Sequence, residues 1–189
     1  MSTQTPAPTS TSQSPYPLEG GCVCGQVRYS LSRPLIAIHA CHCHWCQRQS
    51  GSSYVLNGWI ESSNVTLLNP TEPIKCSIPT PSGDVSDLYR CPKCFTATWM
   101  IDRDAYGLVM VIRVGTIDKS QLVRQPDAHI FVKEKAPWVT IGEGQKQFEE
   151  FYPNREEVWS KESLERWLAL KPEFLKRRAA AEEQKAAKQ

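Results

Sequence analysis

The segment 41–46, with the sequence CHCHWC, constrains this chain more than any other stretch, because it holds three cysteines and two histidines in six residues. The chain has eight cysteines in 189 residues, and seven of them lie in tight C-x-C, C-x-C-x-x-C or C-x-x-C clusters. A disulfide between cysteines one residue apart is strained, whereas thiolates at these spacings suit a metal ion. The spacing therefore predicts metal sites rather than a disulfide framework.

The seven clustered cysteines divide into two predicted zinc sites. Two pairs on separate loops are a usual ligand set for a closed structural site. These pairs are Cys22 with Cys24 and Cys91 with Cys94. The remaining three cysteines are Cys41, Cys43 and Cys46. Three protein ligands leave one position of a tetrahedral zinc open, as in catalytic sites, so we expect two zinc ions per chain, one structural and one catalytic.

Alternatives remain open for the second site. His39, His42 or His44 could supply a fourth ligand and close it. Cys76 could also return to this cluster, but apolar residues flank it at even spacing, which favours a buried cysteine on a strand. His129 opens an apolar run, either as a hydrogen-bonded core histidine or as an acid–base group facing the open site.

The composition excludes several classes of protein. Apolar residues make up 40% of the chain and charged residues 22%, and the formal net charge of +2 gives no support for binding to nucleic acid or membrane surfaces. No apolar run approaches the roughly 18 residues that a membrane-spanning helix needs. Since no secretory signal is visible, we expect a cytoplasmic protein that can also enter the nucleus by diffusion. The sequence does not indicate an oligomeric state.

Hydrophobic patterning predicts a mainly β fold. Val27, Tyr29 and Leu31 alternate with polar residues, which is the period of a strand with one buried face. Residues 43–50 suit a short helical turn that Gly51 closes. Apolar runs bounded by turn residues predict further strands at 35–40, 54–60, 65–68, 74–78, 97–101, 108–114 and 129–132.

The chain divides into four predicted parts. Residues 1–17 contain eight Ser or Thr, four Pro and no charged side chain, which is typical of a disordered leader. The zinc domain then spans 18–140, and a helical extension packed on it spans 141–172. Residues 173–189, rich in Ala, Glu, Gln and Lys, are expected to form a frayed or disordered tail.

The extension carries the signals of one amphipathic helix. Leu164, Trp167 and Leu168 share one helix face. Asn154 and Glu157 have the spacing of a capping box at its start, and a proline shortly after the apolar face would end it.

The cysteine motifs resemble those of the GFA family, whose namesake is the glutathione-dependent formaldehyde-activating enzyme and which includes centromere protein V. The resemblance covers roughly residues 18–139. The segments that carry it are GCVCGQVRY at 21–29, CHCHWCQRQSG at 41–51, CPKC at 91–94, VGTID at 114–118 and HIFVKEKAPW at 129–138.

The resemblance implies a zinc-stapled β-tent fold, a structural zinc on the four paired cysteines and an open zinc on the other three. It further implies a carbon–sulfur lyase acting on glutathione adducts, with glutathione or a glutathione conjugate as partner. Arg48, Lys133 and Lys135 are candidates for binding glutathione carboxylates. The sequence departs from the family at Phe95, where glycine usually follows the C-x-x-C pair, so the turn there is expected to differ.

Two other functions are alternatives to an enzyme. A non-catalytic zinc module that binds a protein partner would favour basic flanks, but the leader has no positive charge. A redox sensor that releases zinc on oxidation would need a resolving cysteine, and only Cys76 is left for that role.

Overall fold

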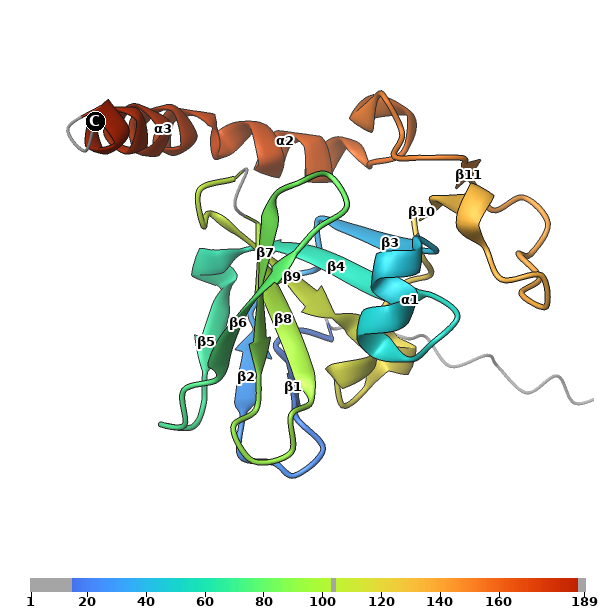
Figure 1. The fold of residues 1–189 in the computed structure, drawn as a ribbon, viewed down its shortest axis with the longest axis horizontal. Helices are drawn as coiled ribbons and strands as arrows, with labels where there is room; N and C mark the ends of the chain where they lie inside the picture. Colours follow the sequence, from blue (N-terminus) through green and yellow to red (C-terminus); the bar gives the residue numbers. More distant parts are fainter. Residues whose placement is uncertain (1–14, 103–104, 187–189) are drawn as a thin grey trace, which may run out of the picture.

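Two β-sheets and a C-terminal helical segment make up the structure, a computed structural model that describes residues 15–102 and 105–186 (Figure 1). The strands are β1 (Leu18–Gly21), β2 (Arg28–Leu31), β3 (Ala37–Cys41), β4 (Val55–Glu61), β5 (Val65–Leu67), β6 (Ile74–Pro79), β7 (Val85–Arg90), β8 (Ala97–Ile101), β9 (Val109–Arg113), β10 (Ala128–Ile130) and β11 (Gln147–Phe148). The α-helices are α1 (His44–Ser50), α2 (Lys161–Ala169) and α3 (Lys171–Ala186). The 3₁₀ turns are η1 (Ser62–Asn64), η2 (Val114–Thr116), η3 (Ser120–Leu122), η4 (Val132–Glu134) and η5 (Arg155–Glu157).

The larger sheet has the strand order β11-β10-β3-β4-β9-β8-β7-β6, and the smaller one has the order β1-β2-β5. Strand β10 pairs in parallel with both β3 and β11, and the other pairs are antiparallel. The predicted fold class, mainly β with a C-terminal helix, is confirmed.

The first hydrophobic core contains side chains from both sheets. Tyr29 and Leu31 of β2 are fully buried, as their alternation with polar residues predicts. The Tyr29 ring lies edge-on to Trp99 of β8, with 5.9 Å between ring centroids, and its hydroxyl lies 2.7 Å from Oγ1 of Thr116. This core joins the small sheet to the large one.

A second core covers β3. All five residues of β3 are buried, because the strand has sheet neighbours on both edges and side chains over both faces. The covering residues include Tyr152, Val158 and Trp159, which come from the C-terminal part of the chain.

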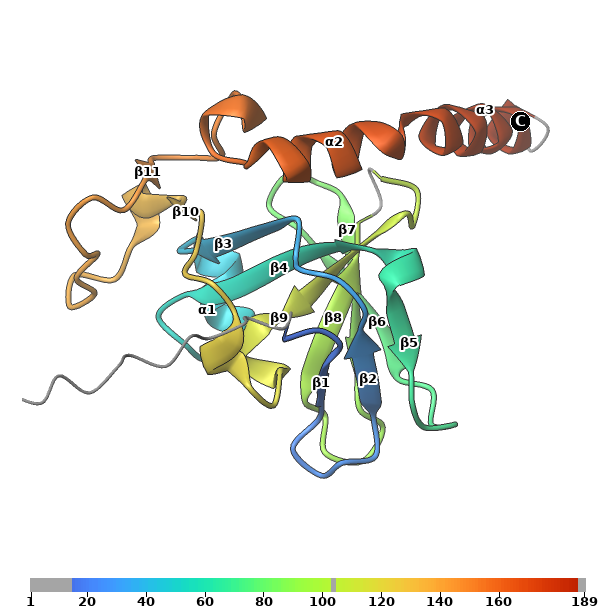
Figure 2. The same cartoon turned by 180° about the vertical axis from the view of Figure 1, so that it is seen from behind.

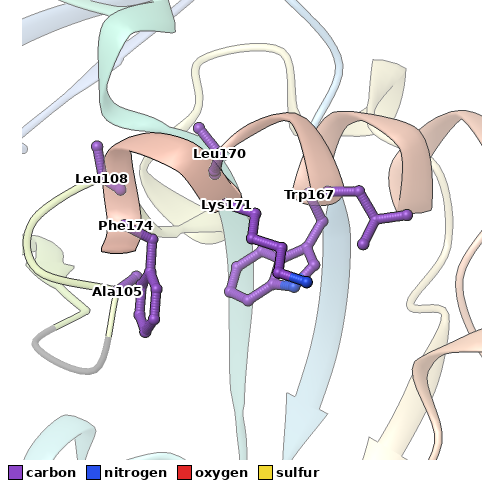
Figure 3. A pocket seen from close by; sticks show the side chains of 7 residues that line it. Ala105, Leu108, Trp167, Leu170, Lys171 and Phe174 are labelled. Carbon is purple, nitrogen blue, oxygen red and sulfur yellow. The ribbon is translucent and has the colours of Figure 1, made fainter. Parts of the chain in front are cut away.

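The C-terminal segment adds strand β11 beside β10 and then crosses the molecule as α2 and α3 (Figures 1 and 2). Arg166 of α2 forms a buried ion pair with Glu61 at the end of β4. Both views show α3 extending beyond the strands. Figure 3 shows Trp167, Leu170, Lys171 and Phe174 beside Ala105 and Leu108, where they line an apolar hollow of about 200 Å³.

The predicted capping box at Asn154 and Glu157 is wrong. Asn154 makes no capping hydrogen bond with its side chain, and the residues after it form only the turn η5. Helix α2 begins later, with Ser160 as the N-cap that accepts a hydrogen bond from the backbone N–H of Ser163. A serine at this position satisfies one of the free N–H groups at the start of a helix.

The ends of the chain lie partly outside the described residues. Most of the predicted leader 1–17 does, although Tyr16 is described and packs against the first core. Helix α3 continues to Ala186, where the sequence indicated a frayed helix or disorder. Within the described ranges, no helix has the length and apolar character needed to cross a membrane.

Candidate metal centres

The first cysteine cluster joins two loops that are far apart in sequence. Cys22 and Cys24 follow β1, and Cys91 and Cys94 lie between β7 and β8. The four Sγ atoms lie within 4.8 Å of one another. Sγ of Cys24 is 3.5 Å from that of Cys22 and 3.7 Å from that of Cys91. Zn–S bonds of about 2.3 Å in a tetrahedron require sulfur atoms about 3.8 Å apart, so this group fits a zinc ion.

Backbone geometry prepares the cluster for thiolates. Gly25 adopts a φ of +77°, which turns the chain after Cys24 at no steric cost. Backbone N–H groups donate to two of the sulfurs, from Val27 to Cys22 at 3.2 Å and from Lys93 to Cys91 at 3.4 Å. Such donors favour the charged form of the sulfur, which is the form that binds a metal.

Phe95, at the position where the family usually has glycine, lies in the turn that follows Cys94. Phe95 itself adopts a left-handed φ of +57°, and its N–H donates to the carbonyl of Cys91 at 3.0 Å. Its side chain is 61% exposed, so little packing offsets the cost of this conformation. The turn therefore has the kind of backbone that glycine adopts freely, with a phenylalanine in its place.

The second cluster lies where β3 ends and α1 begins. Cys41 is the last residue of β3, Cys43 is the N-cap of α1, and Cys46 lies one turn into that helix. The Sγ atoms of Cys41 and Cys43 are 3.4 Å apart, and all three lie within 4.8 Å of one another. The thiol of Cys43 also accepts a hydrogen bond from the N–H of Cys46 at 3.4 Å. The predicted short helix, ended by Gly51 at a φ of 70°, is confirmed.

The three thiols cannot all ionise without a cation. Hydrogen bonds from Cys41 and Cys46 lower the pKa of Cys43 to about 3. The contact with Cys43, helped by burial, raises the pKa of Cys41 well above its usual range. Because like charges at this distance oppose one another, three thiolates together need a metal ion to balance them. The donor set therefore fits a thiophilic metal such as zinc.

No histidine joins this group of three cysteines among the described residues. Nε2 of His39 lies 2.7 Å from the hydroxyl of Tyr152, and Nε2 of His42 lies 2.9 Å from Nδ1 of His129. His44 is exposed and faces a glutamate. Burial lowers the pKa of both His39 and His42 to about 4, so both rings are neutral near pH 7. His129 is thus hydrogen-bonded, but it is only partly buried and is not a core histidine.

Cys76 lies outside both clusters. It sits on β6, as its spacing predicts, but it is only partly buried, because β6 is an edge strand of the large sheet. The expectation of a fully buried cysteine is therefore wrong.

A cavity of about 480 Å³ opens onto the second cluster. Cys41 and Cys46 line it, together with Asn57 and Trp59 of β4. The loop between β6 and β7 and the segment 151–155 form further parts of its wall, through Thr80, Ser82, Asp84, Phe151 and Arg155. Its volume lies within the range of about 300–1,000 Å³ that small-molecule sites occupy.

Much of the chain is similar to known proteins. The model of the GFA family, described as glutathione-dependent formaldehyde-activating enzyme, matches residues 17–134. The chain belongs to the GFA family. It is 27% identical over 128 residues to a Halomonas elongata protein named "Putative glutathione-dependent formaldehyde-activating enzyme", covering 66% of this chain and 80% of that one. A crystal structure of a Rhodobacter sphaeroides protein aligns with 14% identity and a TM-score of 0.43, over 69% of this chain and 99% of that chain.

This GFA domain places a buried cation behind the second cluster. Arg113, at the end of β9, is 6% exposed and donates to Oδ1 of Asn57 and, at 2.5 Å, to Oε1 of Gln49. Nδ2 of Asn57 lies 3.9 Å from Sγ of Cys46. Burial lowers the pKa of Arg113, and its interaction with Cys46 opposes that change. The guanidinium thus balances negative charge on the cluster, a role that sequence reasoning missed.

The cavity also has a wall that lies beyond the family match. Phe151 and Arg155 line it, yet the match ends at residue 134. The basic candidates from the sequence lie elsewhere. Lys133 pairs with Glu150, Lys135 donates to backbone carbonyls, and Arg48 lines a separate surface hollow beside α1. No local pattern identified Phe151 or Arg155, because each lies in an irregular segment.

Proposed function

We propose that this chain is a zinc-dependent enzyme of the carbon–sulfur lyase type that acts on glutathione adducts. The observation that supports it best is the cavity of about 480 Å³ with Cys41 and Cys46 in its wall. Zinc held by Cys41, Cys43 and Cys46 would keep one position for a ligand that reaches it through this cavity. The names of the family and of the Halomonas relative support glutathione and formaldehyde as reactants.

Zinc bound by three thiolates would stabilise the sulfur of a substrate as thiolate near pH 7. In one direction the sulfur of glutathione forms a bond to the carbon of an aldehyde, and the proton of the thiol ends on the aldehyde oxygen. In the other direction that carbon–sulfur bond breaks and the proton returns to sulfur. Neither direction changes the oxidation state, so no electron acceptor is needed.

The residues around the cavity would bind and orient the substrate. Glutathione carries two carboxylates and one ammonium group, and the cavity offers both signs of charge through Arg155, Asp84 and Asp102. Arg113 and Asn57 hold Cys46 in place from behind. We assign no acid–base residue, because the histidines nearest the cluster are buried and hydrogen-bonded to other side chains.

The other cluster would hold a structural zinc. Its cysteines are Cys22, Cys24, Cys91 and Cys94. A closed four-sulfur site contributes on the order of 10 kcal/mol to folding, as much as the whole stability of a domain. Two ions per chain, one closed and one open, are therefore proposed.

Titration calorimetry of glutathione into zinc-loaded protein tests the proposal. The wild-type chain and the matched control Cys76→Ser should release the same heat, since Cys76 lies outside both clusters. Cys46→Ser should lose most of that heat, because its zinc loses a thiolate ligand. Equal heats in Cys46→Ser and Cys76→Ser would rule out a thiol-binding zinc at this site.

An activity assay separates an enzyme from a non-catalytic zinc module. Zinc-loaded protein should speed the breakdown of S-hydroxymethylglutathione above the spontaneous rate, which must be measured without protein and subtracted. Binding of glutathione without any such rate increase would favour the module over the enzyme.

A further inference from the structure

Three aromatic rings surround the part of the cavity next to the second cluster. The rings of Trp59 and Phe151 have centroids 6.4 Å apart and are inclined by only 31°. The ring of His39 stands at 79° to Trp59 and at 75° to Phe151, with 5.5 Å between centroids in each pair. All three line the cavity. We call this group of Trp59, Phe151 and His39 the aromatic recess.

Buried side chains hold the aromatic recess in place. His39 is hydrogen-bonded to the hydroxyl of Tyr152, which also accepts a hydrogen bond from the indole N–H of Trp159. The ring of Tyr152 stacks on Phe151, with 4.4 Å between centroids. Tyr152 is 3% exposed, so it fixes Phe151 from the side that faces the core. The position of Phe151 therefore follows from packing and does not need a ligand.

The apolar part of the cavity lining does not match a one-carbon substituent. Much of the wall is aromatic and, at Val111, Met100 and Ile130, aliphatic. A hydroxymethyl group on sulfur would leave this apolar surface without a partner.

The recess also depends on a segment outside the family match. The family match ends at residue 134, and β11 lies after that point, although it pairs with β10 inside the match. Phe151 and Tyr152 follow β11. The specificity that the recess confers would therefore belong to this chain and to relatives with the same extension.

We propose that the aromatic recess binds a planar aromatic group attached through carbon to the sulfur of a glutathione adduct. The inference rests on the proposed function, because it places the sulfur of that adduct at the cysteine cluster. The ring would lie against the exposed surfaces of Phe151 and Trp59, where offset or edge-on contacts with aromatic side chains are favourable. The substrate class is thus extended from the adduct with formaldehyde to glutathione adducts of aromatic electrophiles.

Calorimetry with two thioethers tests this inference. S-benzylglutathione and S-methylglutathione differ by one phenyl ring, and each is titrated into the zinc-loaded full-length chain. The benzyl compound should bind roughly tenfold more tightly or better in the wild type, because six more carbons leave water and meet aromatic faces. In Phe151→Leu this ratio should fall to roughly threefold or less, since leucine fills the space without a ring face.

The matched control is Phe148→Leu. Phe148 lies in the same segment and its ring centroid is 5.5 Å from that of Tyr152, but it does not line the cavity. This variant should keep the wild-type ratio, which separates a local effect on the recess from a general loosening of the segment.

Each outcome supports or overturns the inference. Equal affinities of the wild type for the two thioethers overturn the inference. If free glutathione still releases heat on binding to the same protein, the proposed function is nevertheless supported. An unchanged ratio in Phe151→Leu, or the same loss in Phe148→Leu, also overturns it. If none of the three ligands gives heat, both the inference and the proposed function are wrong.

Discussion

Substitution of Arg166 by methionine should destabilise the protein by about 3–5 kcal/mol, the cost of leaving a buried charge without its partner. Nε of Arg166 donates to Oε1 of Glu61 at 2.7 Å, and Nη2 donates to Oε2. Both side chains are 8% exposed. A third donor, Nη1, reaches the carbonyl of Pro34 at 2.8 Å. Methionine keeps most of the volume but removes all three bonds, and the carboxylate keeps the hydrogen bond from Asn64.

Thermal and urea unfolding of zinc-loaded protein measure this loss at pH 7. For a chain of this length, the expected loss lowers Tm by roughly 6–20 °C. The double variant Glu61→Leu/Arg166→Met should be more stable than Arg166→Met alone, because it removes the unpaired carboxylate together with its partner. A loss of less than about 1 kcal/mol in Arg166→Met would mean that the pair acts like an exposed one, and it would refute the reasoning.

The pH dependence gives a second check. Burial alone would raise the pKa of Glu61, but the hydrogen bonds from Arg166 and Asn64 outweigh it and hold the pKa below its usual value of 4.5. A carboxyl whose pKa is lower in the folded than in the unfolded state stabilises the protein at every pH above its unfolded pKa. That stability is lost as the pH falls through the lower pKa of the folded state. Removal of Arg166 leaves burial to raise the pKa of Glu61 in the variant, so the difference in stability between wild type and Arg166→Met should begin to shrink at a pH above 4.5 and should keep shrinking as the pH falls through the lowered wild-type value. Zinc loss in acid affects both chains alike, so it cancels in this comparison.

Three further substitutions test the metal centres and the packing. Cys91→Ser should lose one zinc per chain and most of its folded structure, as measured by a colorimetric zinc assay and circular dichroism, because the closed site contributes on the order of 10 kcal/mol. Cys46→Ser should also bind about one zinc less per chain, but it should keep a cooperative thermal transition. If Cys46→Ser loses this transition as completely as Cys91→Ser does, the division into a closed and an open site is contradicted. Gly58→Ala should lower the free energy of unfolding, measured in urea, by about 1–3 kcal/mol. The new Cβ would lie 2.6 Å from Cδ1 of Leu35 and 3.0 Å from Cγ2 of Val114. An unchanged free energy would show that these two side chains can move aside.

The two cysteine clusters could be predicted from the sequence because their signals are local. The C-x-C, C-x-C-x-x-C and C-x-x-C spacings identify themselves within a few residues, and the division into four and three cysteines agrees with the grouping in space. Strand β7 was missed as a strand because its three consecutive buried residues include Ser86 and Asp87, which break the apolar alternation. Asp87 is accommodated there by a hydrogen bond from Ser77 at 2.6 Å.

The surroundings of the second cluster could not be predicted in the same way. Arg113 and Asn57 are 56 positions apart, and only the pairing of β4 with β9 brings them together. Phe151 reaches the cavity because β11 pairs with β10, and a strand of two residues has no detectable period. Side chains in such segments acquire their roles from the fold, so the local sequence holds no signal for them.

The ion pair between Glu61 and Arg166 also sets an order of events during synthesis. The two residues are 105 positions apart, with the carboxylate made first. At about 5–20 residues per second, a ribosome needs roughly 5–20 s to add the arginine that neutralises it. Five of the seven clustered cysteines are translated before Glu61 and the other two, Cys91 and Cys94, before Arg166, so both clusters can form while β4 still ends in an unpaired acid. The two cysteine clusters can therefore form first, and the wall of the cavity is complete only when the last third of the chain, with Phe151 and Arg155, has been made.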